Sequence, residues 1–351
     1  MGANPPPHFE TEGTNMKFCQ ILATTKLCHM ANEEIAARQF HTAHLNWGKV
    51  FRGEVKRVWD PRFDPNDYEV IHAQLTGDTL DAVREIRRRI TGNTLLVVNP
   101  DYSIDSWNIY GHHIETIFDV LNCADIIFGQ CYATVEFLRA QMRDREIYYC
   151  PHPVDTRWLA NHAKTYSSRS KEDVIIAVHR DNERFTPHWV LRGSKLENVQ
   201  KLVTHMVGWN GESTDLSHKI YDHVFPRLTN PEVIDKLYRN AFCIIDHYSY
   251  RVQGRTAMEA AGLGVPYFAW DTCDVAAYCY PELVARPGDL GHHTAMLEDL
   301  INDVDFAAEV SASAKEKIEF FGFEECEKRF RGMIDAHQGK DSSGSNNGSP
   351  A

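Results

Sequence analysis

The sequence predicts an α/β protein built from two doubly wound, Rossmann-like domains in tandem. Short apolar runs rich in Val, Ile, Phe and Tyr alternate with helical segments along most of the chain, a pattern typical of parallel strands buried on both faces. A polar stretch near residue 165 divides this pattern into two nearly equal halves. The length of 351 residues fits two domains of roughly 150 residues each.

The boundaries follow the composition. Residues 1–15 are polar and Pro-rich and residues 337–351 are rich in Ser, Gly and Asn, so we expect both ends to be disordered. Between them we expect an N-terminal domain over 16–165 and a C-terminal domain over 166–336. Strands are expected at 17–23, 50–58, 68–73, 94–99, 125–128, 147–150, 174–178, 202–207, 241–246 and 265–269. Helices are expected at 32–47, 79–90, 133–141, 231–238 and 256–263, with terminal helices over 294–336.

Composition narrows the class of protein. Thirty-seven Lys and Arg against 49 Asp and Glu give a net charge of −12, which argues against a surface that binds nucleic acid or anionic lipid throughout, though not against a local basic cleft. No apolar run approaches the roughly 20 residues of a membrane helix. The polar N-terminus does not look like a secretory signal. The nine cysteines are scattered with no CxxC pair, so we expect reduced thiols and a cytoplasmic protein.

Several catalytic motifs are missing. The segment 24–27 (TTKL) after the first expected strand contains no glycine, whereas a dinucleotide site needs GxGxxG there. There is no Walker A motif, no GxSxG and no HExxH in the chain. The one DxD, at residues 303–305, lies in the late helical stretch, and we interpret it as surface charge. We therefore expect no metal and no resident cofactor.

Residues 230–266 (NPEVIDKLYRNAFCIIDHYSYRVQGRTAMEAAGLGVP) form the most informative stretch. A helix leads into a strand, a loop follows, and a second helix begins near Thr256. Gly254 lets the backbone approach a ligand, while the helix N-terminus directs N–H groups and a positive dipole end into the cleft, where a phosphate fits. Glu259 lies about one turn further on and could accept hydrogen bonds from a ribose diol. These residues equally allow a capping or solvated glutamate beside a packing glycine.

This stretch resembles the C-terminal signature of GT-B glycosyltransferases, particularly the retaining enzymes of glycosyltransferase family four. Residues 259–266 (EAAGLGVP) match that family's Glu-Ala-(Met/Ala)-x-x-Gly-x-Pro run. Residues 68–73 (YEVIHA), 124–127 (ADII) and 149–156 (YCPHPVDT) resemble further family segments in the same order. The resemblance covers most of the chain and implies two Rossmann-like domains that face a cleft, an acceptor domain followed by a nucleotide-sugar donor domain.

The resemblance assigns roles on the donor side. Glu259 inherits the ribose-binding role of the second Glu in the family's E-x7-E pattern. The first Glu of that pattern, which contacts the donor sugar, is replaced by Arg251, where a cation would suit an acidic sugar or a further phosphate contact. Gly254, Arg255 and Thr256 form the helix start and are expected to bind the donor phosphates.

The resemblance also assigns binding roles to residues that follow the expected strands. Arg180 and Arg184 follow the first strand of the second domain and resemble the family's diphosphate-binding Arg and Lys, a position at which guanidinium groups bind phosphate well. With Glu259 they form the expected catalytic set. On the acceptor side, Asp101 matches the Asp of a family His-Asp pair, and His72 and His112 are candidate substitutes for its missing His. An isolated His near a strand end is more often a structural hydrogen-bonding residue.

The implied reaction moves a sugar from a nucleotide-diphosphate donor to an acceptor hydroxyl on a glycan, a lipid or another compound. By resemblance it retains the anomeric configuration. Arginines and a helix N-terminus can stabilise the leaving diphosphate without a metal.

Two other interpretations remain open. The acceptor could be modified DNA, bound by the Arg-rich helix 79–90, which could equally dock on an anionic membrane or simply be a solvated outer face. The chain could also be a degenerate protein that binds sugar nucleotides without turnover, as the replacement at Arg251 would suggest.

Overall fold

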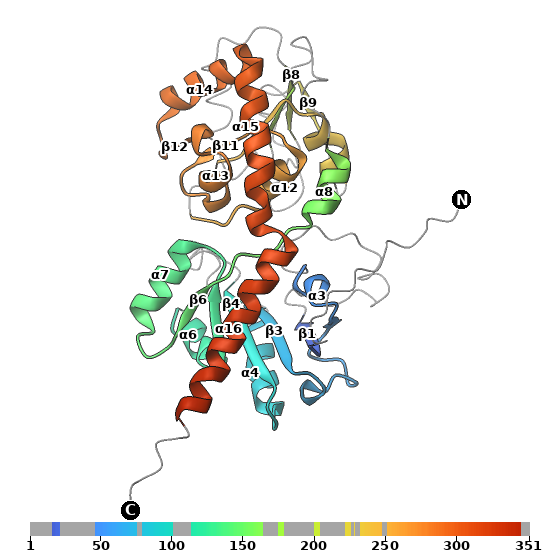
Figure 1. The fold of residues 1–351 in the computed structure, drawn as a ribbon, viewed down its shortest axis with the longest axis vertical. Coiled ribbons are helices and arrows are strands. Elements are labelled where there is room, and N and C mark those ends of the chain that lie inside the picture. Colours follow the sequence, from blue (N-terminus) through green and yellow to red (C-terminus); the bar gives the residue numbers. More distant parts are fainter. Residues whose placement is uncertain are drawn as a thin grey trace, which may run out of the picture.

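The computed structural model describes residues 16–21, 46–75, 79–100, 114–163, 175–178, 200–203, 222–225, 228, 232–247 and 251–344. Two six-stranded sheets, one in each half of the chain, lie one above the other along the long axis (Figure 1). All of their strand pairs are parallel. The predicted fold class, two parallel-sheet α/β domains, is confirmed.

The first sheet has the strand order β2-β1-β3-β4-β5-β6. Its strands are β1 (Phe18–Ile21), β2 (Glu54–Lys56), β3 (Val70–Leu75), β4 (Leu95–Pro100), β5 (Ile126–Gly129) and β6 (Ile147–Tyr149). The helices of this half are α3 (Asn46–Val50), α4 (Leu80–Arg89), α6 (Ile114–Leu121) and α7 (Tyr132–Gln141), with a short 3-10 turn η2 (Pro65–Asp67). The strands between the edges are buried, as expected when helices cover both faces of a parallel sheet.

The second sheet has the order β12-β11-β10-β7-β8-β9. Its strands are β7 (Ile175–Val178), β8 (Gln200–Val203), β9 (His223–Val224), β10 (Cys243–Ile245), β11 (Tyr267–Trp270) and β12 (Val284–Ala285). Its helical elements are α8 (Thr156–His162), η6 (Val233–Leu237), η7 (Tyr238–Asn240), α12 (Arg255–Leu263), α13 (Asp274–Cys279), η8 (Pro281–Leu283), α14 (Leu290–Asn302), α15 (Val304–Lys317) and η9 (Ile318–Phe321). The order reverses direction between β7 and β10, as in a dinucleotide-type doubly wound sheet.

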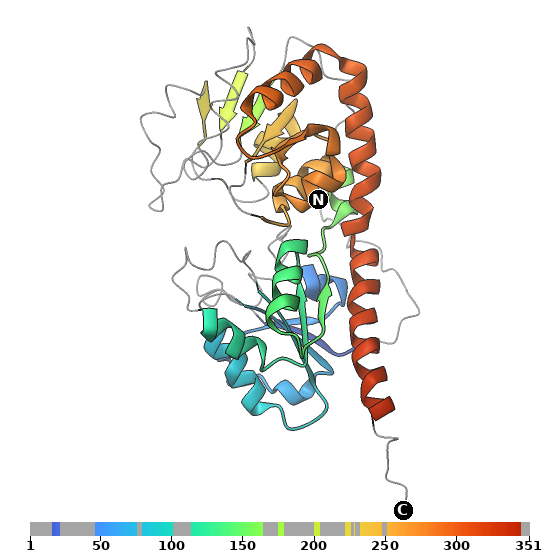
Figure 2. The same ribbon diagram turned by 90° about the vertical axis from the view of Figure 1, so that its left-hand side faces the viewer.

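The last helix, α16 (Phe323–Gly344), returns to the first half of the chain. Figure 2 shows α15 and α16 following one another along the same side of both sheets. Phe330 of α16 packs against Phe18 and Trp47 in a core cluster of the first sheet. The helix extends beyond residue 336, where we expected the folded part to end.

Most expected elements are present with shifted ends. Helix α3 contains residues 46 and 47, the end of the helix expected over 32–47, whose earlier part lies outside the described residues. Val50, expected to begin a strand, ends α3 instead, and β2 starts at Glu54. Helices α6, α8 and α13 and the two-residue strands β9 and β12 were not predicted from the sequence. The predicted N-terminal segment 1–15 and the polar break near residue 165 lie outside the described residues. Within the described ranges, no helix is both long and apolar enough to cross a bilayer.

Candidate functional site

The second sheet reverses its strand order between β7 and β10, and Gly254 and Glu259 follow β10 in the chain. β7 and β10 are neighbours and parallel, so their carboxyl ends lie side by side. The loop to α12 follows β10, and the segment containing Arg180 and Arg184 follows β7. Ligands of doubly wound sheets bind at such a reversal point. Arg180 and Arg184 themselves lie outside the described residues.

Gly254 shapes the start of α12. It has φ 98°, in the left-handed region, and a Cβ there would lie 2.2 Å from Cys273 Sγ. Only glycine meets both conditions without displacing the chain. Gly254 is the N-cap and has no side chain with which to cap the helix, and the first N–H groups of an α-helix have no partner within the helix itself. With the positive dipole end, they form an environment suited to an anionic group.

Backbone hydrogen bonds fix the loop before Gly254. Val252 N donates to Thr272 O (3.0 Å), and Asp274 N donates back to Val252 O (3.0 Å). Val275 N donates to Gln253 O (2.9 Å). The loop thus adds a strand-like pairing to the segment between β11 and α13, and the helix start is held in one position before any ligand binds.

Glu259 is buried inside the second domain, with 2% of its surface exposed. Its Oε1 lies 3.5 Å from Arg255 Nε, one turn earlier on α12. Burial raises the pKa of the Glu259 carboxyl, and the Arg255 guanidinium partly offsets this. Glu259 is therefore neither a solvated side chain nor the helix cap. Its carboxylate is shielded from water, so it forms strong hydrogen bonds with any ligand hydroxyl group that reaches it.

Two further buried residues, Tyr238 and Thr256, lie near Glu259. Tyr238, at the end of the helix that precedes β10, is fully buried, and its hydroxyl is hydrogen-bonded to the Thr256 side chain. Burial raises the pKa of Tyr238 well above its ordinary value, and the nearby carboxylates of Glu259 and Asp246 raise it further. Thr256, predicted as a phosphate ligand, has a side chain 1% exposed. Its backbone N–H, in the first turn of α12, can still serve that role.

Arg251 lies exposed on the same loop. Its charge acts on Asp274, whose pKa is raised by burial to about 6, while the Tyr132 N–H and Arg251 lower it. Asp274 Oδ2 accepts a hydrogen bond from Tyr132 N (2.8 Å), at the start of α7 in the first domain. This carboxylate therefore joins the two halves. No motif marks Asp274 in the sequence, because its partner is 142 residues away.

The acceptor-side candidate His72 lies deep in the first domain. Its ring is fully buried, 5.6 Å from the Phe128 ring and 6.1 Å from the Trp47 ring. Its Nε2 lies 2.8 Å from Asn99 Oδ1. This environment matches the structural hydrogen-bonding role of a core histidine. Asp101 and His112, the other acceptor-side candidates, lie outside the described residues.

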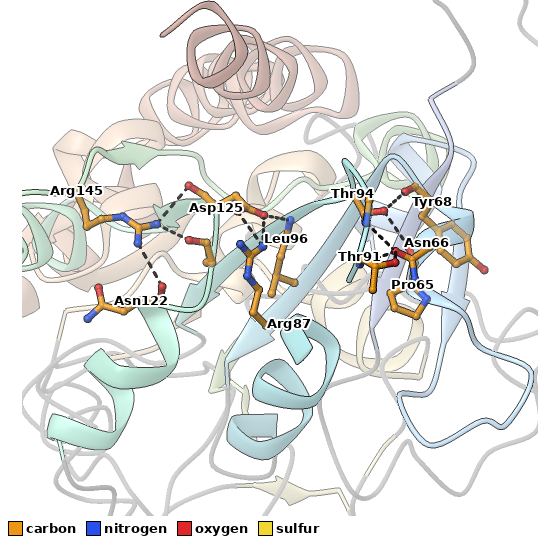
Figure 3. Close-up of polar contacts among 12 residues, drawn as sticks. Pro65, Asn66, Tyr68, Arg87, Thr91, Thr94, Leu96, Asn122, Asp125 and Arg145 are labelled. Carbon is orange, nitrogen blue, oxygen red and sulfur yellow. Dashed lines mark hydrogen bonds and ion pairs between the residues drawn. The ribbon is translucent and has the colours of Figure 1, made fainter. Parts of the chain in front are cut away.

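The arginines of α4 are bound to neighbouring groups. Arg87 donates to both carboxylate oxygens of Asp125 (3.0 Å each), and Asp125 Oδ2 also accepts from Leu96 N (2.8 Å), as Figure 3 shows. Arg88 pairs with Glu85 at 2.8 Å. Because Asp125 directly precedes β5, this end of α4 lies at the amino edge of the sheet, opposite the ligand-binding edge. A DNA phosphate would have to displace these carboxylates.

The DxD sequence has a local role. Asp303 is the N-cap of α15 and accepts a hydrogen bond from Phe306 N (2.9 Å), while Asp305 lies exposed in the first helical turn. Across the part of the chain that the structure describes, no group of three or more His, Cys, Asp or Glu side chains is placed to hold a metal ion.

Two doubly wound parallel sheets in tandem are the arrangement of the GT-B fold, and solved structures share it. Sucrose-phosphate synthase from Thermosynechococcus elongatus superimposes with a TM-score of 0.65 at 14% identity, over 92% of this chain and 100% of that one. An alpha-glucosyltransferase in complex with UDP and a 13-mer DNA gives 0.60 at 10% identity, over 92% and 99%. An α,α-trehalose 6-phosphate synthase from Burkholderia multivorans gives 0.56 at 12% identity, over 80% and 73%.

At these identities the likeness shows the fold alone. No family model and no curated protein matches the chain. The chain has the GT-B glycosyltransferase fold, and the match to family four rests on the short sequence runs given above.

Proposed function

We propose that the protein is a glycosyltransferase that transfers a sugar from a nucleotide-diphosphate donor to an acceptor hydroxyl. The observation that carries this proposal is the combination, on α12, of a helix start whose N-cap is Gly254, a residue without a capping side chain, and the buried carboxylate of Glu259. The first suits a diphosphate, and the second suits the hydroxyls of a ribose. Both lie at the edge of the sheet where doubly wound folds bind nucleotides.

The proposed chemistry needs stabilised negative charge on the leaving diphosphate. Arg255, the α12 N-terminus and the predicted pair Arg180 and Arg184 supply cationic and N–H groups for that purpose. We therefore propose a reaction independent of metal, with retention as in the family that residues 259–266 resemble. A chelator should leave the activity intact, and NMR of the first product should show the donor's anomeric configuration.

The test begins with binding. A panel of sugar nucleotides is titrated into the protein by calorimetry, and any ligand that binds is followed for release of its nucleotide. We expect Glu259→Ala and Arg180→Ala each to weaken donor binding at least about tenfold, while Glu282→Ala, an exposed glutamate on η8, leaves it unchanged. Unchanged affinity in both site variants would reject the site. Binding without nucleotide release would favour the degenerate binding protein.

Modified DNA is a second candidate acceptor, supported by the neighbour crystallised with UDP and DNA. The paired arginines of α4 make that helix a poor phosphate-binding surface. Transfer to a hydroxymethylated duplex, compared with transfer to a soluble sugar or to vesicles of anionic lipid carrying a hydroxyl acceptor, would identify the acceptor class.

We further propose that the protein works in a reducing compartment, since none of the eight cysteines in the described ranges forms a disulfide.

A further inference from the structure

The loop before α12, residues 251–254, is called the donor loop here because the proposed donor site begins there. The side chain of Gln253 joins this loop to the segment that connects the two domains. Its Oε1 accepts a hydrogen bond from His152 N and its Nε2 donates to His152 O, each at 3.0 Å. His152 lies between β6, the last strand of the first sheet, and α8 of the second half. Both residues are buried. The amide of Gln253 thus pairs with both backbone groups of His152, as a neighbouring strand would.

The same residue directly precedes Gly254 and the start of α12. Its backbone carbonyl is held by Val275 N, so both its backbone and its side chain are fixed. Two turns along α12, a Cβ at Gly262 would lie 2.5 Å from Leu159 Cδ1 on α8, which shows how closely α12 packs on the helix that follows the connecting segment. The start of the proposed phosphate-binding helix is therefore attached to the connecting segment itself, and its later turns pack on α8.

The ring of His152 continues the connection into the first domain. Its Nδ1 accepts a hydrogen bond from Trp47 Nε1 (3.2 Å), and its Nε2 lies 3.4 Å from Asn99 Nδ2. Asn99 is on β4 and contacts His72 on β3. A buried chain of polar groups therefore runs from the donor loop to strands of the acceptor domain.

We propose that Gln253 is a positioning residue: it locks the donor helix to the connecting segment, so that the sugar's leaving group is held in register with an acceptor in the first domain. This inference rests on the proposed function. Transfer to an acceptor needs both reactants in one geometry, whereas hydrolysis of the donor needs only water, so loosening the lock penalises transfer more than hydrolysis.

The experiment compares Gln253→Ala with Gln20→Ala, a matched control. Gln20 is also buried, and its Oε1 accepts from Gly48 N (2.8 Å), but that bond stays within the first domain. Both variants are expected to lower the melting temperature. In Gln253→Ala, donor affinity should stay within about twofold while the ratio of hydrolysis to transfer rises about tenfold. In Gln20→Ala the ratio should not change.

Gln253→Glu gives a second readout. Its ionised carboxylate cannot donate to His152 O, so the ratio should rise at pH 8. Its protonated form can donate, so the ratio should fall back toward the wild-type value at pH 5. A folded Gln253→Ala variant with an unchanged ratio, or an equal rise in Gln20→Ala, would overturn the inference.

Small-angle scattering of the ligand-free proteins separates this inference from the proposed function. A larger maximum dimension in Gln253→Ala than in Gln20→Ala supports the lock even if no sugar nucleotide binds, in which event only the proposed function fails. Equal dimensions together with an unchanged ratio reject the lock while a working donor site still supports the function.

Discussion

Replacing Glu259 by glutamine is expected to move stability and donor binding in opposite directions. The carboxyl is 2% exposed, and burial raises its pKa above the ordinary 4.5 despite the nearby Arg255. A carboxyl with a raised folded-state pKa holds its proton more tightly when the chain is folded. Its contribution to the free energy of unfolding is therefore fully present below pH 4.5 and is lost as the pH rises through the folded-state pKa.

The size of the stability effect follows from linkage. Within that window one carboxyl changes the free energy of unfolding by at most about 1.4 kcal/mol per pH unit. Glutamine has nearly the same shape as glutamate and does not titrate. The Glu259→Gln variant therefore does not lose free energy of unfolding at this position as the pH rises. We expect the two proteins to unfold alike in urea at pH 4 and the variant to be more stable by about 1 kcal/mol at pH 8.

The same change should weaken donor binding. A hydrogen bond to a charged group contributes about 1.5–3 kcal/mol, and a neutral amide retains only part of two such bonds. A loss of about 3 kcal/mol corresponds to roughly 100-fold in affinity, measured by calorimetry at pH 8. Glu282→Gln on the exposed surface is the control. The reasoning fails if Glu259→Gln is less stable at pH 8 than the wild type, or if it binds donor within twofold of it.

Three further changes test neighbouring contacts. Asp274→Asn keeps an acceptor for the α7 start but removes a carboxyl whose pKa burial raises from 3.8 to about 6. Chemical denaturation should show a gain of about 3 kcal/mol at pH 8 and almost none at pH 3.5, and an equal gain at both pH values would contradict the prediction. Gly254→Ala forces a Cβ onto Cys273 Sγ at φ 98°, so it should cost about 2–4 kcal/mol in urea unfolding and at least about tenfold in donor affinity. Gly262→Ala places a Cβ against Leu159 and should lower the free energy of unfolding by about 1–3 kcal/mol while donor affinity stays unchanged. A parallel loss of affinity would show that any strain in α12 weakens donor binding and that Gly254 has no particular role in it.

The sequence predicts the two sheets because each central strand is an apolar run with helices on either side. Strands such as 126–129 and 267–270 are wholly buried, and their runs of apolar residues alone predict them. Edge strands β9 and β12 are two residues long, too short for any periodicity. The position of α16 is likewise not encoded in its own residues, because it depends on the packing of Phe330 against Phe18 and Trp47, which are distant in the sequence.

The site is predicted in part. Gly254 and Glu259 are recognisable because glycine and glutamate stand at a fixed spacing around a helix start. The burial of Glu259 is a tertiary property, and from the sequence a solvated glutamate looks the same. Gln253 and His152 are 101 residues apart, so nothing local to either residue indicates their pairing. Residues that join domains are missed for this reason.

Helix α12 combines several features that each destabilise the folded chain. It starts from a left-handed glycine against Cys273, its N-cap residue has no side chain to cap the first N–H groups, and it buries the carboxylate of Glu259. A helix selected only for packing would have a capping side chain and an apolar residue in that position. We propose that these features suit one ligand, because a diphosphate can bind at the helix start and the hydroxyls of a ribose can bind the carboxylate. Unfavourable local features that one molecule would satisfy together indicate a binding site rather than a fault in the core.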